Sequence, residues 1–200
     1  AEDLGYEKFD ILSQRGIGHI GDAVKFIAQN RREKIDIHDI PAFKRDPDIA
    51  AQIEKGETIG CFYVESPAMR SLLRKLDCRD YLTLVAASSI IRPGVSSSGM
   101  MQEYIRRYHN PQSFQYLHPV LEELLHETYG VMVYQEDVLK VVHHYAGLDL
   151  AEADVLRRAM SGKYRSKEEM MRIVNGFHEG AAKMGRPEAV TKELWRQIES

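Results

Sequence analysis

The chain has few cysteines, and they do not form a recognisable framework. Cys61 and Cys78 lack the CxxC spacing of zinc and redox motifs. This spacing excludes a disulfide-stapled secreted fold and predicts two reduced thiols in a cytosolic protein. The eight histidines form neither HExxH nor another paired metal-binding spacing. We therefore expect no zinc site.

Long hydrophobic runs are also missing. No apolar stretch approaches the ~20 residues needed to cross a bilayer, and the sequence opens with neither a signal peptide nor a transit sequence. We therefore expect a cytoplasmic protein without a membrane partner. With 44% hydrophobic residues and only seven prolines in 200 residues, the chain can bury a core and is not a disordered tail.

A strong charge of either sign is lacking as well. Lysine and arginine number 27 against 30 aspartates and glutamates, which gives a net charge of −3. This balance excludes a small basic protein that coats nucleic acid, but it leaves room for a local binding groove. Basic residues do gather between 157 and 172, and such a cluster in a slightly acidic chain indicates a polyanionic ligand.

The N-terminal part predicts short strands and helices. Residues 6–12 alternate as a strand, glycines at 16, 18 and 21 predict a turn, and helical periodicity follows at 22–32. A loop is expected at 35–46, a helix to Lys55, and a second short strand at Ile59–Val64. Another helix begins at Ser66-Pro67 and carries Leu72 and Leu76.

The pattern from Asp80 onward is almost entirely helical. Apolar stripes with start and stop signals predict helices near 80–91, 98–108, 118–127, 135–146, 150–161, 166–184 and 187–199. The predicted fold class is therefore mainly α, with α+β character at the N-terminus. The sequence begins with Ala1, and its last predicted helix runs to Ser200 without a cap, so we expect a piece of a longer chain.

Two adjacent arginines form the first candidate site. At helical spacing, Arg157 and Arg158 lie opposite an apolar face that includes Leu156. Arginine suits phosphate binding because it offers paired donors. Most such pairs are solvated surface, however, and a second pair, Arg106-Arg107, lies on another predicted helix. Spacing alone does not choose between the pairs, but the basic residues that follow the first pair favour it.

Asp10 forms the second candidate site. It lies on an apolar predicted strand, where a carboxylate is rare unless it is paired, hydrogen-bonded or bound to metal. Magnesium prefers one or two carboxylates together with phosphate oxygens, so Asp10 supplies half of such a site. The alternative is an aspartate at the strand end that caps the following turn. A phosphate-binding arginine pair and a strand-borne carboxylate together outline a nucleotidyl-transfer site.

Five segments, taken in order, resemble the bacterial C-family replicative DNA polymerases, the DNA polymerase III alpha subunit family. They are KFDIL at 8–12, IGCFYVES at 59–66, IIRPGVSSSGM at 90–100, TYGVMVYQEDV at 128–138 and ADVLRRAMSGK at 153–163. The resemblance covers nearly the whole chain, from about Tyr6 to Glu179. Family members more often have RPGPLQSGM and AMGKK at two of these places.

The resemblance implies a fold, a reaction and site residues. It implies that residues 1–21 are the end of a polymerase-β-like nucleotidyltransferase palm and that residues 22–200 are a helical fingers domain, truncated at its C-terminal end. Asp10 matches the third of three aspartates that bind two Mg²⁺ ions, and the other two precede it in the family. Arg157 and Arg158 match arginines that contact the triphosphate of the incoming nucleotide.

The same resemblance makes Lys163 a supporting cation at the triphosphate. The implied partners are primer–template DNA, a deoxynucleoside triphosphate, and other replicase subunits bound through regions outside this sequence. With one of three metal-binding aspartates, the isolated chain is expected to be inactive. The alternative is a non-enzymatic helical module that binds nucleic acid or a protein through residues 157–172.

Overall fold

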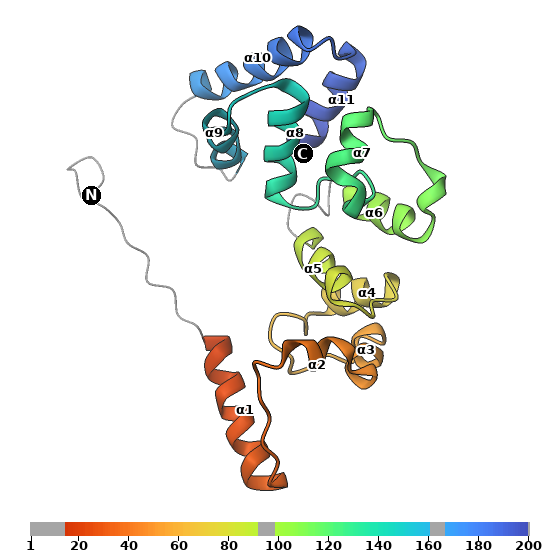
Figure 1. Ribbon diagram of the computed structural model, residues 1–200, viewed down its shortest axis with the longest axis vertical. Helices are drawn as coiled ribbons and strands as arrows, with labels where there is room; N and C mark the ends of the chain where they lie inside the picture. The colour runs from red at the N-terminus through yellow and green to blue at the C-terminus, as the bar shows by residue number, and fades with distance from the viewer. Residues whose placement is uncertain (1–14, 92–98, 161–166, 200) are drawn as a thin grey trace, which may run out of the picture. The chain divides into compact units, whose positions relative to one another are not determined.

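The computed structural model describes residues 15–91, 99–160 and 167–199, and every regular element in these ranges is helical (Figure 1). The chain divides into two compact units, Ala1–Asp46 and Pro47–Ser200. Within the described ranges there is no β-strand. The mainly helical prediction is confirmed, whereas the described residues do not support α+β character at the N-terminus. In the same ranges, no helix is both long and apolar enough to cross a membrane.

In the first unit, helix α1 (Arg15–Arg31) begins earlier than predicted. The turn expected at Gly16, Gly18 and Gly21 is wrong, because all three glycines lie within the helix. None of them has the positive φ that a glycine turn exploits. Glycine costs a helix only about 1 kcal/mol relative to alanine, so helical context overrides it here.

The other N-terminal predictions have different outcomes. The strand predicted at residues 6–12 lies outside the described residues. The predicted boundary between residues 21 and 22 lies within α1, and the division into palm and fingers stays a prediction. The predicted loop at 35–46 contains a short helix, α2 (Ile40–Arg45), because the Asp39 side chain accepts a hydrogen bond from the Ala42 amide at 3.2 Å.

The strand predicted at Ile59–Val64 is also wrong, since the segment forms consecutive turns. The Cys61 amide donates to the Thr58 carbonyl at 3.1 Å. Gly60 has φ 81° and Tyr63 has φ 73°, both in the left-handed region that interrupts an extended chain. The apolar, β-prone composition that predicted a strand does not reveal these two backbone conformations.

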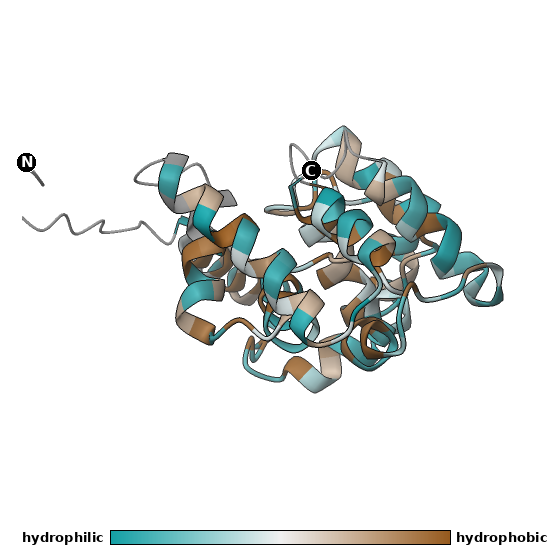
Figure 2. Ribbon diagram, turned by 90° about the horizontal axis from the view of Figure 1, so that it is seen from above, coloured by the Kyte–Doolittle hydropathy of each residue, from teal (hydrophilic) through white to brown (hydrophobic). Residues whose placement is uncertain are grey.

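The second unit follows the predicted helices closely. Its described helices are α3 (Pro47–Glu54), α4 (Pro67–Lys75), α5 (Tyr81–Ile90), α6 (Met100–His109), α7 (Pro119–Leu125), α8 (Gln135–Ala146), α9 (Leu150–Met160), α10 (Lys167–Lys183) and α11 (Glu188–Glu199), with 3₁₀ turns η2 (Pro111–Ser113) and η3 (His126–Thr128). Figure 2 shows hydrophobic and hydrophilic residues alternating along the helices, as amphipathic packing requires.

Two hydrophobic clusters hold the second unit together. The α4–α6 cluster is built on fully buried side chains such as Leu73, Leu76 and Ile90. The α7–α11 cluster surrounds α8, which packs against α7, α9 and α10 (Figure 1). Its most buried members include Val141 and Tyr145. Helix α8 is therefore the central helix of the larger cluster.

A short non-helical segment joins the two clusters. Val131 and Val133 belong to the α4–α6 cluster, and Met132, between them, belongs to the α7–α11 cluster. All three side chains are 4% exposed. Side chains that alternate in direction are typical of an extended chain with buried surface on both sides. The motif around residues 128–138 therefore has a packing role.

Helix α10 crosses the end of α8 at Gly180. A Cβ atom built on Gly180 would meet the Ala146 carbonyl oxygen at a clashing distance, with a side-chain carbon of Leu148 at 3.4 Å. Gly176, one turn earlier on α10, has open space around its Cβ position. The absence of a side chain at residue 180 therefore lets the two helices approach closely.

We predict that Gly180→Ala lowers the free energy of unfolding by about 1–3 kcal/mol, because the methyl group forces α10 away from α8. Gly176→Ala is the matched control, and it should raise stability by about 0.5–1 kcal/mol through helix propensity. Urea unfolding of both variants measures the difference. Equal effects of the two substitutions would contradict the close contact.

Candidate functional site

Helix α9 carries the first predicted arginine pair, and local hydrogen bonds fix its start. The Asp149 amide donates to Glu152 Oε2 at 3.1 Å, and the Glu152 amide donates to Asp149 Oδ1 at 2.8 Å. This reciprocal capping satisfies two amides at the beginning of the helix. Ala153 and Leu156 are fully buried against the α7–α11 cluster.

Arg157 lies at the edge of the buried side of α9, one turn after Ala153. Its Nε and Nη2 atoms lie 2.9 and 2.8 Å from Oδ1 of Asp154, one turn earlier. The side chain is 35% exposed, and that of Asp154 is 39% exposed. A guanidinium that is partly exposed and held by a carboxylate on its own helix has a restricted orientation and remains accessible to an anion.

The other predicted site residues are less well described. The backbone of Arg158 belongs to α9, but its side chain lies outside the described residues, as do Asp10 and Lys163. Where the structure describes the chain, no group of three acidic, histidine or cysteine side chains could hold a metal. The roles assigned to all four residues, Arg157 included, stay predictions.

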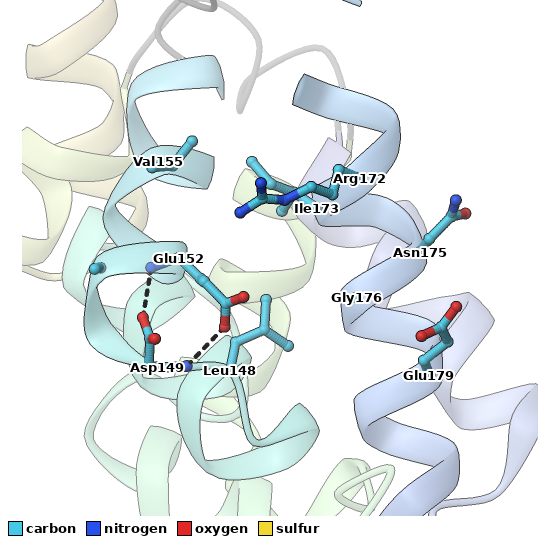
Figure 3. Close-up of a pocket in the computed structure, with 10 residues that line it drawn as sticks. Leu148, Asp149, Glu152, Val155, Arg172, Ile173, Asn175, Gly176 and Glu179 are labelled. Carbon is cyan, nitrogen blue, oxygen red and sulfur yellow. Dashed lines mark hydrogen bonds between the residues drawn. The ribbon is translucent and has the colours of Figure 1, made fainter. Parts of the chain in front are cut away.

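A cleft of about 630 Å³ lies between α9 and α10. Arg172 reaches from α10 toward α9, while the Glu152 carboxylate is held at the start of α9 (Figure 3). The cleft is lined by Leu148, Asp149, Ala151, Glu152, Val155, Arg172, Ile173, Asn175, Gly176 and Glu179. Three carboxylates against one guanidinium make this cleft a poor site for a polyanion. The phosphate-binding hypothesis therefore depends on the exposed side of α9 and not on the cleft.

The second pair, Arg106-Arg107, is bound within the fold. Arg107 donates from Nε to Glu103 at 2.7 Å and from Nη1 to the Tyr129 carbonyl at 2.9 Å. Its guanidinium also lies over the Phe114 ring, 4.3 Å from the centroid. With an 18% exposed side chain, Arg107 joins α6 to the segment after η3. The sequence did not reveal this structural role, because the contacts come from residues distant along the chain.

Glu103 holds both arginines of this second pair. Arg106 donates to the two carboxylate oxygens at 2.9 and 2.6 Å. Hydrogen bonds from Arg106, strengthened by those from Arg107, lower the pKa of Glu103 from 4.5 to about 2. Glu103 is therefore ionised throughout the neutral range and remains a fixed acceptor.

Asp137 is the buried carboxylate of the TYGVMVYQEDV motif. It is 3% exposed and accepts from the amides of Val133 and Tyr134 at 3.0 and 2.9 Å. Burial raises the pKa of Asp137 above its ordinary value, although these hydrogen bonds oppose the shift. Its position at the start of α8 indicates a capping role. The residue types alone do not distinguish Asp137 from the other acid at this junction.

Comparison with known proteins gives consistent matches. Residues 17–185 match the family model of the bacterial DNA polymerase III alpha subunit finger domain. DNA polymerase III subunit alpha of Campylobacter jejuni is 36% identical in an alignment 202 residues long, which includes 98% of this chain. The subunits of Staphylococcus aureus (strain COL) and Staphylococcus epidermidis are 37% and 36% identical over 99% of it. The chain spans 16 to 18% of the length of these relatives.

The different settings of the two arginine pairs predict different effects on stability. Arg107→Ala should lower the free energy of unfolding by about 2 kcal/mol, because it removes two hydrogen bonds and the contact with Phe114. Arg157→Ala, the matched control, should cost less than about 1 kcal/mol, because its ion pair is partly exposed. Thermal unfolding compares them, and a larger loss for Arg157→Ala would contradict the assignment.

Glu103 should make stability depend on pH in the acid range. Its pKa is lower in the folded than in the unfolded chain, so its contribution is present above about pH 4.5 and is lost as the pH falls toward 2. Glu103→Gln should therefore be less stable than the parent at pH 7, with the difference shrinking on acidification. Urea unfolding from pH 7 to pH 2 tests this, and a difference independent of pH would contradict it.

Proposed function

The chain belongs to the bacterial DNA polymerase III alpha subunit family and matches its finger domain; from this premise we propose that it forms fingers of a DNA-directed DNA polymerase that replicates bacterial DNA. The proposed reaction is attack of a primer 3′-hydroxyl on the α-phosphate of a deoxynucleoside triphosphate, which breaks the bond to the β-phosphate and releases pyrophosphate. Primer–template DNA and other replicase subunits are the proposed macromolecular partners.

Helix α9 is the proposed triphosphate-binding element. The observation that supports this best is the position of Arg157, partly exposed and held by Asp154, on a helix that Ala153 and Leu156 anchor in the core. A helix fixed by packing presents its arginines with little loss of conformational freedom on binding. Arg157 and Arg158 would neutralise the charge that develops on the β- and γ-phosphates, with Lys163 as a supporting cation.

Asp10 is the proposed metal ligand, and two Mg²⁺ ions are the proposed cofactors. Bound ions of this kind lower the pKa of an attacking hydroxyl and stabilise the leaving oxygens. The described residues hold no cluster that would bind them, so we derive no step through the ions. Because the resemblance assigns two further aspartates to the site, we propose that the isolated chain does not extend a primer.

We predict that Arg157→Ala, made in a complete polymerase containing this chain, lowers kcat/KM for nucleotide incorporation by about 10²–10³. Arg157→Lys should restore the activity only in part, because lysine lacks the paired donors. Arg106→Ala is the matched control from the second pair and should stay within tenfold of the parent. Single-nucleotide primer extension measures all three variants.

Two outcomes would contradict this proposal. A loss below tenfold in Arg157→Ala would remove α9 from the triphosphate site. Robust primer extension by the isolated 200-residue chain would show that it contains a complete catalytic centre. Binding of DNA that is sensitive to salt but indifferent to triphosphate would instead favour a non-enzymatic binding module.

A further inference from the structure

The start of α7 is held by a histidine side chain. His118 is the N-cap residue, and its Nδ1 atom accepts a hydrogen bond from the Val120 amide at 3.2 Å. The buried residues of this helix, Leu121 and Leu125, belong to the α7–α11 cluster. A cap satisfies an amide that has no carbonyl partner within the helix. The acceptor at Nδ1 therefore helps to fix α7 on this cluster.

The other ring nitrogen of His118 faces a guanidinium. Nη1 of Arg186, from the segment between α10 and α11, lies 3.3 Å from Nε2 of His118. An arginine nitrogen donates hydrogen bonds and does not accept them. Both nitrogens of the ring thus face a donor, whereas a neutral imidazole has one acceptor nitrogen and an imidazolium has none. The surroundings therefore accommodate a neutral His118 ring and oppose a protonated one.

Arg186 cannot turn away from the histidine without losing its other contacts. Its Nε atom donates to the Tyr145 carbonyl at 3.1 Å, and Nη2 donates to the carbonyl of His144, an exposed residue, at 3.3 Å. The guanidinium also lies over the Tyr145 ring, 5.3 Å from the centroid. These carbonyls are in the last turn of α8, where the helix dipole favours a cation. The positive charge beside His118 is therefore a fixed part of the fold.

The groups around His118 add to the penalty for a charged ring. Tyr145 of α8 packs against the imidazole edge to face, with ring centroids 5.5 Å apart. The acids closest in sequence, Glu122 on α7 and Glu188 on α11, are both exposed, and Glu188 forms an ion pair within α11. Burial, and then the charge of Arg186, lower the pKa of His118 below its ordinary value.

We propose that His118 is a pH-sensitive cap that holds the start of α7 against the end of α8. At neutral pH its uncharged ring accepts the Val120 amide. Uptake of a proton removes that acceptor and places a second positive charge beside Arg186, so the cap opens and α7 loosens from the α7–α11 cluster. This inference depends on contacts within the second unit and is independent of the proposed function.

The pH-sensitive cap predicts the direction in which stability changes with pH. Since the pKa of His118 is lower in the folded than in the unfolded chain, the unfolded state binds more protons as the pH falls. The contribution of His118 is complete above about pH 6.5, the ordinary histidine value, and is lost as the pH falls below it. Glu103 loses its contribution only below about pH 4.5. The interval from pH 7 to pH 5 therefore separates the histidine from this carboxylate.

The test follows the 200-residue chain between pH 7 and pH 5 by NMR and by urea unfolding. We expect the imidazole signals of His118 to titrate with a midpoint below about 6.5, and the Val120 amide signal to change with the same midpoint. The parent should lose stability over this interval. His118→Asn keeps an N-cap oxygen but does not titrate, so it should lose less. Arg186→Gln should raise the midpoint, because it removes the neighbouring charge.

His109 provides the matched control. Its Nε2 atom lies 2.6 Å from the Lys75 carbonyl oxygen, an acceptor to which a protonated ring can still donate. His109→Gln should therefore lose stability with acid as the parent does. A His118 midpoint at or above about 6.5, or equal losses in His118→Asn and the parent, would overturn the proposal. If Arg186→Gln does not fold, the comparison of His118→Asn with the parent still decides.

Discussion

Three consecutive side chains tie the two hydrophobic clusters of the second unit together. Val131 and Val133 pack on one side and Met132 on the other, so a shift by one residue would move each side chain into the other hydrophobic cluster. Asp137 fixes the register by accepting the amides of Val133 and Tyr134 as α8 begins. A buried carboxylate is costly unless its partners are in place. The start of the central helix therefore depends on one well-satisfied acid.

The far end of α8 sets the direction of the helix that carries the candidate site. The Gly180 contact with the Ala146 carbonyl brings α10 against α8. Helix α9 begins four residues after α8 ends, is capped by its own first turn, and is packed against both α8 and α10. With Ala153 and Leu156 buried, Arg157, one turn after Ala153, lies at the edge of the buried face and keeps a 35% exposed side chain. The orientation of the arginine thus follows from packing around α8.

Helices with a local, periodic hydrophobic pattern could be located from the sequence alone. Apolar stripes and caps located α3 and α4–α11 to within a few residues, because amphipathic spacing and helix burial have the same cause. The strand prediction for Ile59–Val64 is wrong because its β-prone composition does not reveal that two of its residues adopt positive φ. At α1 the glycines adopt helical backbone conformations, and at α2 the Asp39 side chain caps a short helix within the expected loop. In each of these segments the backbone conformation, and not the residue type, determined the secondary structure. A hydrophobic pattern does not contain information on backbone conformation.

The two arginine pairs show why the candidate site could be predicted only in part. Both pairs lie on amphipathic helices, and both have an acid one turn earlier, Glu103 or Asp154. The pairs differ in the contacts that their arginines make with residues distant in the sequence. Arg107 also binds the Tyr129 carbonyl and covers Phe114, contacts that form only when distant segments fold together. Exchanging those contacts for phosphate would open the α4–α6 side of the fold, whereas the Arg157–Asp154 pair lies within one turn of one helix. A partly exposed ion pair within one helix contributes little to stability, so its arginine is better suited to bind a ligand than Arg107 is.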